Sequence, residues 1–159
     1  MPINNVVINA SPLILLCKSD LENLLTELFD EILVPEAVVD EISRGNDIVS
    51  QKLQSLIWLK KVSVRIPDEI LIWNLGDGES EVLSFARANR EVRAVIDDKA
   101  ARNCARTLEI KILGTGGILI LAKKRGLITS VTDALKKLQD AGLYISDGIA
   151  GLLKREAGE

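Results

Sequence analysis

The sequence contains no histidine among its 159 residues. This absence excludes Ser-His-Asp and Cys-His catalysis, histidine general bases and zinc sites built on imidazole. Any hydrolytic chemistry must therefore come from carboxylates, from lysine or from water bound to a metal ion. Aromatic residues make up only 3% of the chain, so platforms that stack the bases of single-stranded nucleic acid are scarce.

Cysteine is also rare, because only Cys17 and Cys104 are present and neither belongs to a CxxC pair. Each lies in an apolar stretch, which predicts buried thiols of an intracellular protein. No apolar run approaches the roughly 20 residues that a membrane-spanning helix needs. The first residues, MPINNVVINAS, lack the basic start and long apolar core of a secretory leader. We therefore expect a cytoplasmic protein without a membrane partner.

The length predicts a single domain over residues 1–159, with a sizeable core. The net charge of −3 hides an uneven distribution, because residues 1–81 carry 14 acids and 6 bases. Residues 99–125 carry 7 bases and 1 acid. An acidic part beside a basic part suits a polyanion held near bound cations. A solvated surface on which the charges happen to segregate explains the pattern equally well.

Short apolar runs alternate with stretches of helical periodicity along the chain. The runs predict strands at residues 6–8, 32–34, 62–64, 94–96 and 111–113. A first helix is predicted after Ser11, its expected N-cap, and further helices at residues 21–28, 36–43, 48–59, 79–89, 100–108, 118–125, 130–140 and 146–156. This alternation is typical of an α/β protein with a parallel sheet covered on both faces. In such sheets, ligands bind beyond the carboxyl ends of the strands.

Polar side chains follow the predicted strands or lie on the apolar faces of predicted helices, and the candidates are Asn9, Glu41, Glu79 and Asp97. Burying an unpaired carboxylate is costly, and a shared divalent cation would remove that cost. At about 100° per residue, Glu41 and Glu79 fall on the apolar sides of their helices. Their neighbours Asp40 and Glu81 point away and are expected to be solvated. The choice between Asp97 and Asp98 stays open, because the chain leaves a strand there.

Each candidate also has a purely structural explanation. Glu79 could favour a helix N-terminus, where a negative charge gains about 0.3–1 kcal/mol. Glu41 could pair with a lysine or arginine, and Asp97 could cap the helix that follows. Asn9 could hydrogen-bond to the backbone in its own turn. Their joint placement at one end of the predicted sheet is what favours a binding site.

The helix predicted at residues 100–108 has an apolar stripe and, roughly opposite, a basic stripe formed by Lys99, Arg102 and Arg106. Beside a metal site this stripe would hold a nucleic-acid backbone, because phosphate neutralisation dominates such binding. Solvated surface is the alternative. The segment Gly114-Thr115-Gly116-Gly117 suggests a phosphate loop but lacks the GK[ST] ending and the GxGxxG spacing. A tight strand-to-helix turn is therefore predicted.

Taken together, several segments resemble the PIN-like domain family. They are VVINASPLILL, ILVPEAVVDEI, GDGESEVLSFA, AVIDDKAAR and GTGGILILAKKRGLI, and they occur in the family's order and spacing from residue 5 to about residue 128. The nearest resemblance is to VapC-type toxin ribonucleases, in a branch found beside small antitoxin-like proteins.

The resemblance implies a three-layer α/β/α sandwich whose acidic cluster binds Mg²⁺ or Mn²⁺ and cleaves single-stranded RNA. By position, the family's four acidic sites match Asn9, Glu41, Glu79 and Asp97 (or Asp98), and Ser11 matches a small hydroxyl residue that supports the first site. Glu41, Glu79 and Asp97 would hold the metal. The resemblance also implies a dimer and inhibition by a small antitoxin protein.

Asn9 departs from the family pattern, in which the first site usually carries aspartate. Asparagine offers a metal one neutral carbonyl oxygen and removes a full negative charge, whereas hard cations favour carboxylates. Two hypotheses therefore stand beside a metal-dependent ribonuclease. One is a nuclease-like domain with weak or no turnover that binds RNA or a protein. The other is a structural cluster in which the acids pair with the basic segment.

Overall fold

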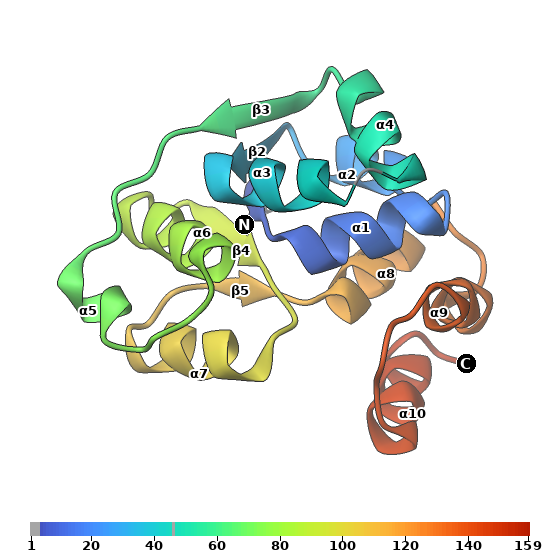
Figure 1. Cartoon of the computed structure of the whole chain (residues 1–159). Coiled ribbons are helices and arrows are strands. Elements are labelled where there is room, and N and C mark those ends of the chain that lie inside the picture. The colour runs from blue at the N-terminus through green and yellow to red at the C-terminus, as the bar shows by residue number, and fades with distance from the viewer. Residues whose placement is uncertain (1–3, 46) are drawn as a thin grey trace.

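Five parallel strands form the centre of the computed structural model, which describes residues 4–45 and 47–159 (Figure 1). They are β1 (Asn5–Ile8), β2 (Glu31–Pro35), β3 (Leu59–Val62), β4 (Val92–Val95) and β5 (Ile112–Leu113). Their order across the sheet is β3-β2-β1-β4-β5, and each neighbouring pair is parallel. The predicted α/β fold is confirmed. Residues 1–3, which entered the argument against a secretory leader, lie outside the described residues.

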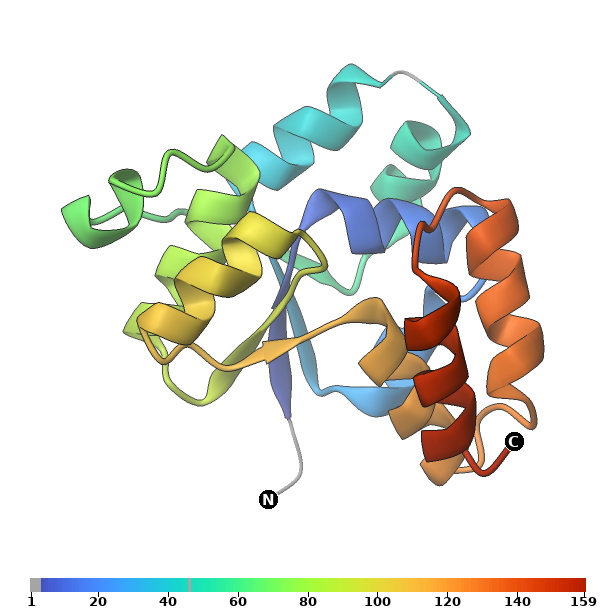
Figure 2. The same cartoon turned by 90° about the horizontal axis from the view of Figure 1, so that it is seen from below.

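Helices surround this sheet on both sides. They are α1 (Ala10–Lys18), α2 (Asn23–Leu28), α3 (Glu36–Arg44), α4 (Ile48–Ser55), α5 (Asp68–Leu71), α6 (Asp77–Ala88), α7 (Lys99–Thr107), α8 (Thr115–Lys124), α9 (Val131–Asp140) and α10 (Asp147–Glu156). Figure 2 shows α6 and α7 on one side of the strands and α8, α9 and α10 on the other. Within the described ranges, no helix has the length and apolar character that a membrane crossing requires.

The two central strands β1 and β2 are each built on one short apolar run. Val6, Val7 and Ile8 of β1 are all fully buried, and Ile32, Leu33 and Val34 of β2 are nearly so. A continuous apolar run, without alternation, is the pattern of a parallel strand covered on both faces. Burying each such side chain contributes about 1.5–3 kcal/mol. β3 differs because Lys60 and Lys61 are exposed on it, and charged side chains protect an edge strand from further pairing.

Both cysteines are free and buried, as predicted. Burial, together with the nearby Glu22 carboxylate, raises the pKa of the Cys17 thiol to about 11. Burial also raises the pKa of Cys104. A thiol with a raised pKa stays protonated near neutral pH, so both side chains act as small apolar groups in the core.

Some predicted boundaries are wrong. Asn9, not Ser11, is the N-cap of α1. Pro12 therefore occupies the third helical position, where its missing N–H would have had no partner within the helix anyway. β3 begins at Leu59, three residues before the predicted strand, so the preceding helix ends at Ser55. The four-residue helix α5 was not predicted.

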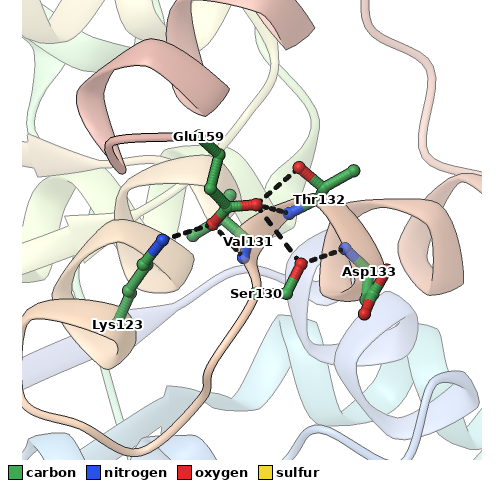
Figure 3. Close-up of polar contacts among 6 residues, drawn as sticks. All are labelled: Lys123, Ser130, Val131, Thr132, Asp133 and Glu159. Atoms are coloured by element: carbon green, nitrogen blue, oxygen red, sulfur yellow. Dashed lines mark hydrogen bonds and ion pairs between the residues drawn. The ribbon is translucent and has the colours of Figure 1, made fainter.

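The side chain of Glu159 holds the first turn of α9 in place (Figure 3). Its carboxylate accepts hydrogen bonds from the backbone N–H groups of Val131 and Thr132 at 2.7 and 2.9 Å, and it forms a 2.7 Å ion pair with Lys123 of α8. The pKa of Glu159 lies well below its usual range. The main cause is Lys123, followed by the Thr132 hydroxyl and the two backbone N–H groups. This acid therefore joins α9 to α8 through a helix N-terminus.

Replacing Glu159 with glutamine should lower the melting temperature at pH 7, because the amide loses the charge that Lys123 and α9 stabilise. A carboxyl whose pKa is depressed by folding stabilises above its unfolded pKa, and this contribution is lost as the pH falls through the folded value. Thermal melts should therefore show the wild type and Glu159→Gln converging as the pH falls below about 4. Glu156→Gln, at an exposed position of α10, is the control; an equal effect of both substitutions would contradict the anchoring role.

Candidate functional site

The carboxyl ends of β1 and β4 meet where the strand order reverses. From the central β1 the chain builds β2 and β3 toward one edge and then returns to β4 and β5 on the other side. The backbone N–H of Asn9 donates to the carbonyl of Val95 over 3.0 Å, so Asn9 and Asp97 leave adjacent strands. Open parallel sheets bind ligands at such a reversal. Both strand-end candidates lie at this edge.

Asn9 is only 4% exposed, and its side chain does not cap α1. Its Oδ1 lies against Gly78 in the first turn of α6, 3.2 Å from the position that a Cβ would take on that glycine. The amide therefore faces a neighbouring helix rather than its own turn. Ser11, expected to support this position, is the second residue of α1 and is exposed.

The two consecutive aspartates hold two different helices. Asp98 is the N-cap of α7, and its Oδ2 accepts a 3.0 Å hydrogen bond from the Ala101 N–H. Asp97 does not cap α7; its Oδ1 accepts a 2.8 Å hydrogen bond from the Thr115 N–H, and its Oδ2 accepts one from the Thr115 hydroxyl. The structure thus gives Asp98 a capping role and leaves Asp97 as the carboxylate at the strand ends.

The glycine-rich segment forms the tight passage from β5 into α8, as predicted, with Gly114 as the N-cap and the next three residues in the first turn of the helix. Its anion position, at the first turn of α8, is filled by the chain's own Asp97 carboxylate. The glycines are explained by packing: a Cβ at residue 116 would lie 2.8 Å from Leu153 of α10, and one at residue 117 would lie 2.6 Å from Leu113. Sequence reasoning missed Thr115, which is 1% exposed, although it follows a predicted strand just as Asn9 and Asp97 do.

Glu79 is half-buried in the first turn of α6. Its side chain folds back over the N-cap residue Gly76 and occupies the space that a Cβ there would need. A negative charge at this position stabilises the positive end of the helix dipole, so the structural explanation of Glu79 holds whether or not the carboxylate also binds a ligand.

Glu41 was predicted to face inward, and this prediction is wrong because the side chain is exposed. The buried stripe of α3 is formed by Val38 and Ile42, and Glu41 lies at its margin. Glu41 instead lines an open cleft of about 770 Å³ between α3 and the start of α6, together with Asp40, Arg44, Asp77 and Gly78 among others. Asp40 is exposed, as expected, in the same cleft.

Glu81 was predicted to be solvated, and this too is wrong. The residue is half-buried, and its Oε1 accepts a 3.2 Å hydrogen bond from the backbone N–H of Ala37 in the first turn of α3. The helical wheel gave the wrong result because it considers α6 against the sheet only, whereas α3 packs along another face of α6. Glu81 therefore joins the two helices that border the cleft.

None of the carboxylates of Glu41, Glu79 and Asp97 forms an ion pair with a lysine or arginine within the described ranges. This opposes the hypothesis that the acids serve only to pair with the basic segment. Lys99, Arg102 and Arg106 are exposed on α7, as predicted. Nη1 of Arg102 lies 3.6 Å from the Cβ position of Gly114, and Asp97 Oδ1 lies 3.1 Å from the same point, so a cation is near this carboxylate without a direct ion pair.

The donor set at this edge consists of oxygens, which hard divalent cations prefer. Across the described residues, no three acidic or cysteine side chains converge as a ready-made metal cage. Mg²⁺, however, is commonly held by one or two carboxylates together with substrate phosphates. Each of the three nearby oxygen donors lies against a glycine at the start of a helix, so no Cβ fills the adjoining space. These donors are Asp97, Glu79 and the neutral oxygen of Asn9. These residues fit a cation that binds together with a phosphate-bearing substrate.

Comparison with known proteins gives a family match over residues 5–159, to the family model described as a PIN domain. No curated protein and no solved structure matches the chain significantly.

The roles of Asp97 and Asp98 can be distinguished by substitution. Asp98→Ala should lower the free energy of unfolding by about 1 kcal/mol in urea titrations, because α7 loses its N-cap. Asp98→Asn keeps a capping oxygen and should retain most of that stability. Any rise in melting temperature that Mg²⁺ causes in the wild type should be the same in Asp98→Asn. A loss of the Mg²⁺ response in this variant would instead make Asp98 a ligand.

Proposed function

Because the chain belongs to the PIN domain family, whose members are nuclease-like domains, we propose that it is a ribonuclease that cleaves single-stranded RNA with the help of Mg²⁺ or Mn²⁺. One observation carries this proposal: Asn9 and Asp97 follow adjacent strands, Asn9 beside the start of α6 and Asp97 at the start of α8, and the candidate carboxylates Glu41, Glu79 and Asp97 have no lysine or arginine partner within the described residues. Unpaired carboxylates at the ligand-binding edge of a sheet suit a cation-assisted reaction at a phosphate.

The chain's own residues would position the reacting groups. The Thr115 N–H and hydroxyl hold both oxygens of Asp97, so this carboxylate is oriented before substrate binds. Glu79 and Asp97, with Glu41 from the adjoining cleft, would hold the divalent cation, and Asn9 would add a neutral oxygen. When bound, the cation would supply activation of an attacking water and stabilisation of the phosphodiester oxygens.

The basic stripe of α7 would hold the RNA backbone. Arg102 reaches the same glycine as Asp97 and would meet a phosphate beside the cleavage site, while Lys99 and Arg106 extend the positive charge along the exposed face of the helix. Phosphate contacts of this kind position a strand without reading its sequence.

Purified protein should cut labelled single-stranded RNA with Mg²⁺ or Mn²⁺, and EDTA should stop the reaction. Glu79→Gln should lower the cleavage rate by roughly 100-fold or more, the scale of losing one electrostatic contact in an active site. Glu27→Gln, which removes an exposed acid from α2, is the matched control and should cut at the wild-type rate. Cleavage that persists in EDTA, or equal rates for both variants, would refute the assignment.

Asn9 favours a second candidate, a nuclease-like domain with weak or no turnover that binds RNA or a protein. Its nearly buried amide stands beside the positive end of α6, where an aspartate would contribute a negative charge to the metal site. Without that charge, affinity for a hard cation is lower.

Restoring the charge decides between the two candidates. If turnover is weak, Asn9→Asp should raise both the Mg²⁺ affinity measured by calorimetry and the cleavage rate at least about tenfold, the effect of roughly 1.4 kcal/mol. Asn9→Ala, which removes the oxygen without adding a charge, is the control. A wild type that binds Mg²⁺ and cuts RNA as well as Asn9→Asp would exclude the second candidate.

We extend the first proposal to the biological role suggested by the resemblance to VapC-type ribonucleases. In this role the chain is the toxin half of a toxin–antitoxin pair in the cytoplasm and forms a homodimer. A small protein encoded next to it would hold it inactive.

A further inference from the structure

One face of α6 borders two hollows in succession. Asp77, Glu81, Ser84 and Ala88 follow one another at the spacing of three or four residues that places side chains on one helix face. Asp77 lines the cleft that also contains Glu41, whereas Ser84 and Ala88 line a second hollow of about 500 Å³. Residues 65–69 also line the second hollow, and they lie where the chain passes from β3 into α5 beside α6 (Figure 1).

A ridge separates the two hollows. On this face of α6, Glu81 lies between Asp77 and Ser84. Its hydrogen bond to the Ala37 N–H joins α6 to the first turn of α3 at that point. The Ser63 hydroxyl donates to Glu36 Oε1 over 3.0 Å and fixes the chain after β3 against the same turn of α3. The two hollows therefore lie toward opposite ends of this face of α6, with the contact between Glu81 and α3 between them.

Two arginines, Arg65 and Arg87, line the second hollow. Neither is within ion-pair distance of an acid in the described part of the chain, although Asp68 and Glu69 line the same hollow. Nη1 of Arg87 is buried and has no hydrogen-bond acceptor among the described residues. A buried donor that lacks a partner is costly. The planar guanidinium offers paired N–H donors that match the oxygens of a phosphate.

We propose that this Arg65–Arg87 hollow binds a backbone phosphate of the RNA strand whose cleavage is proposed for the neighbouring cleft, and the inference rests on that proposed function. With a rise of about 1.5 Å per residue, Asp77 and Ala88 lie roughly 16 Å apart along α6. A single nucleotide cannot reach from one hollow to the other, so the strand must continue for several nucleotides past the cleavage site. The cleft that contains Glu41 would take the phosphate that meets the cation, and the Arg65–Arg87 hollow would bind a later phosphate of the strand directly.

Fluorescence anisotropy with labelled single-stranded RNA tests this assignment, with Ca²⁺ in place of Mg²⁺ and gels to confirm that the RNA stays intact. Arg65→Gln should raise the Kd of a decanucleotide about fivefold to tenfold, and it should reduce the slope of log Kd against log salt by about 0.7, the value for one phosphate contact on a single strand. Lys136→Gln, which removes an exposed charge from α9, should change neither.

RNA length provides the sharper comparison, because a dinucleotide cannot span both hollows. Arg65→Gln should leave dinucleotide binding unchanged while it weakens binding of the decanucleotide. Equal loss for both lengths, or an effect no larger than that of Lys136→Gln, would overturn the inference. Arg87→Lys is a second variant that keeps the charge but loses the paired donors, and it should weaken only the longer RNA. Because Arg65 is exposed, the test does not depend on how Arg87→Lys folds.

The inference and the proposed function can fail separately. If RNA binding depends on Arg65 but the RNA is not cut, the proposed ribonuclease activity is wrong and the phosphate site is supported. If RNA is cut normally and binds to Arg65→Gln as tightly as to the wild type, only the proposed phosphate site is wrong. If inorganic phosphate raises the melting temperature of the wild type but not of Arg65→Gln, while RNA binding is unaffected by the substitution, the hollow takes free phosphate and the RNA assignment is wrong.

Discussion

Helix N-termini gather at the carboxyl edge of a parallel sheet, because each strand there passes into the helix that follows it. In this protein the unsatisfied N–H groups of those helices are bonded by the chain's own carboxylates. Asp98 holds the start of α7, Asp97 the start of α8 and Glu81 the start of α3. Asp97 and Asp98, both candidates for a reactive site, therefore also fix the positions of helices around it, which is why the site cannot be separated cleanly from the fold.

This dual use explains which parts of the site the sequence could predict. Asn9 and Asp97 were found because a polar residue directly after an apolar β-branched run belongs at a strand end, whatever the rest of the chain does. Glu81 was assigned to the wrong environment because helical periodicity reports one buried face, whereas α6 also packs on α3. Glu41 was misassigned because it lies only at the margin of the apolar stripe of α3. The partnership of Asp97 with Thr115 depends on β5 lying next to β4, which local sequence does not specify. The fold was predictable because β1 and β2 are built on short continuous apolar runs and each passes directly into a helix.

The carboxyl edge of the sheet carries unusually few negative charges in this chain. With Asn9 neutral and Glu41 in an open cleft, Asp97 and Glu79 are the remaining carboxylates among the four candidate positions, and both already stabilise helix starts. A cation would therefore complete its coordination with oxygens from a substrate phosphate, because the protein alone supplies few. Substrate and metal would then bind with mutual dependence, each strengthening the binding of the other.

The contact between Gly116 and Leu153 links the last helix to this edge. Gly116 follows Thr115 in the first turn of α8, and a side chain there would collide with Leu153 of α10. A larger residue at 116 would therefore displace either α10 or the turn that carries Thr115, and in the latter case the Asp97 carboxylate would lose its support. Among homologous chains, substitutions at these two positions should consequently be correlated, with a bulkier residue in one helix accompanied by a smaller one in the other.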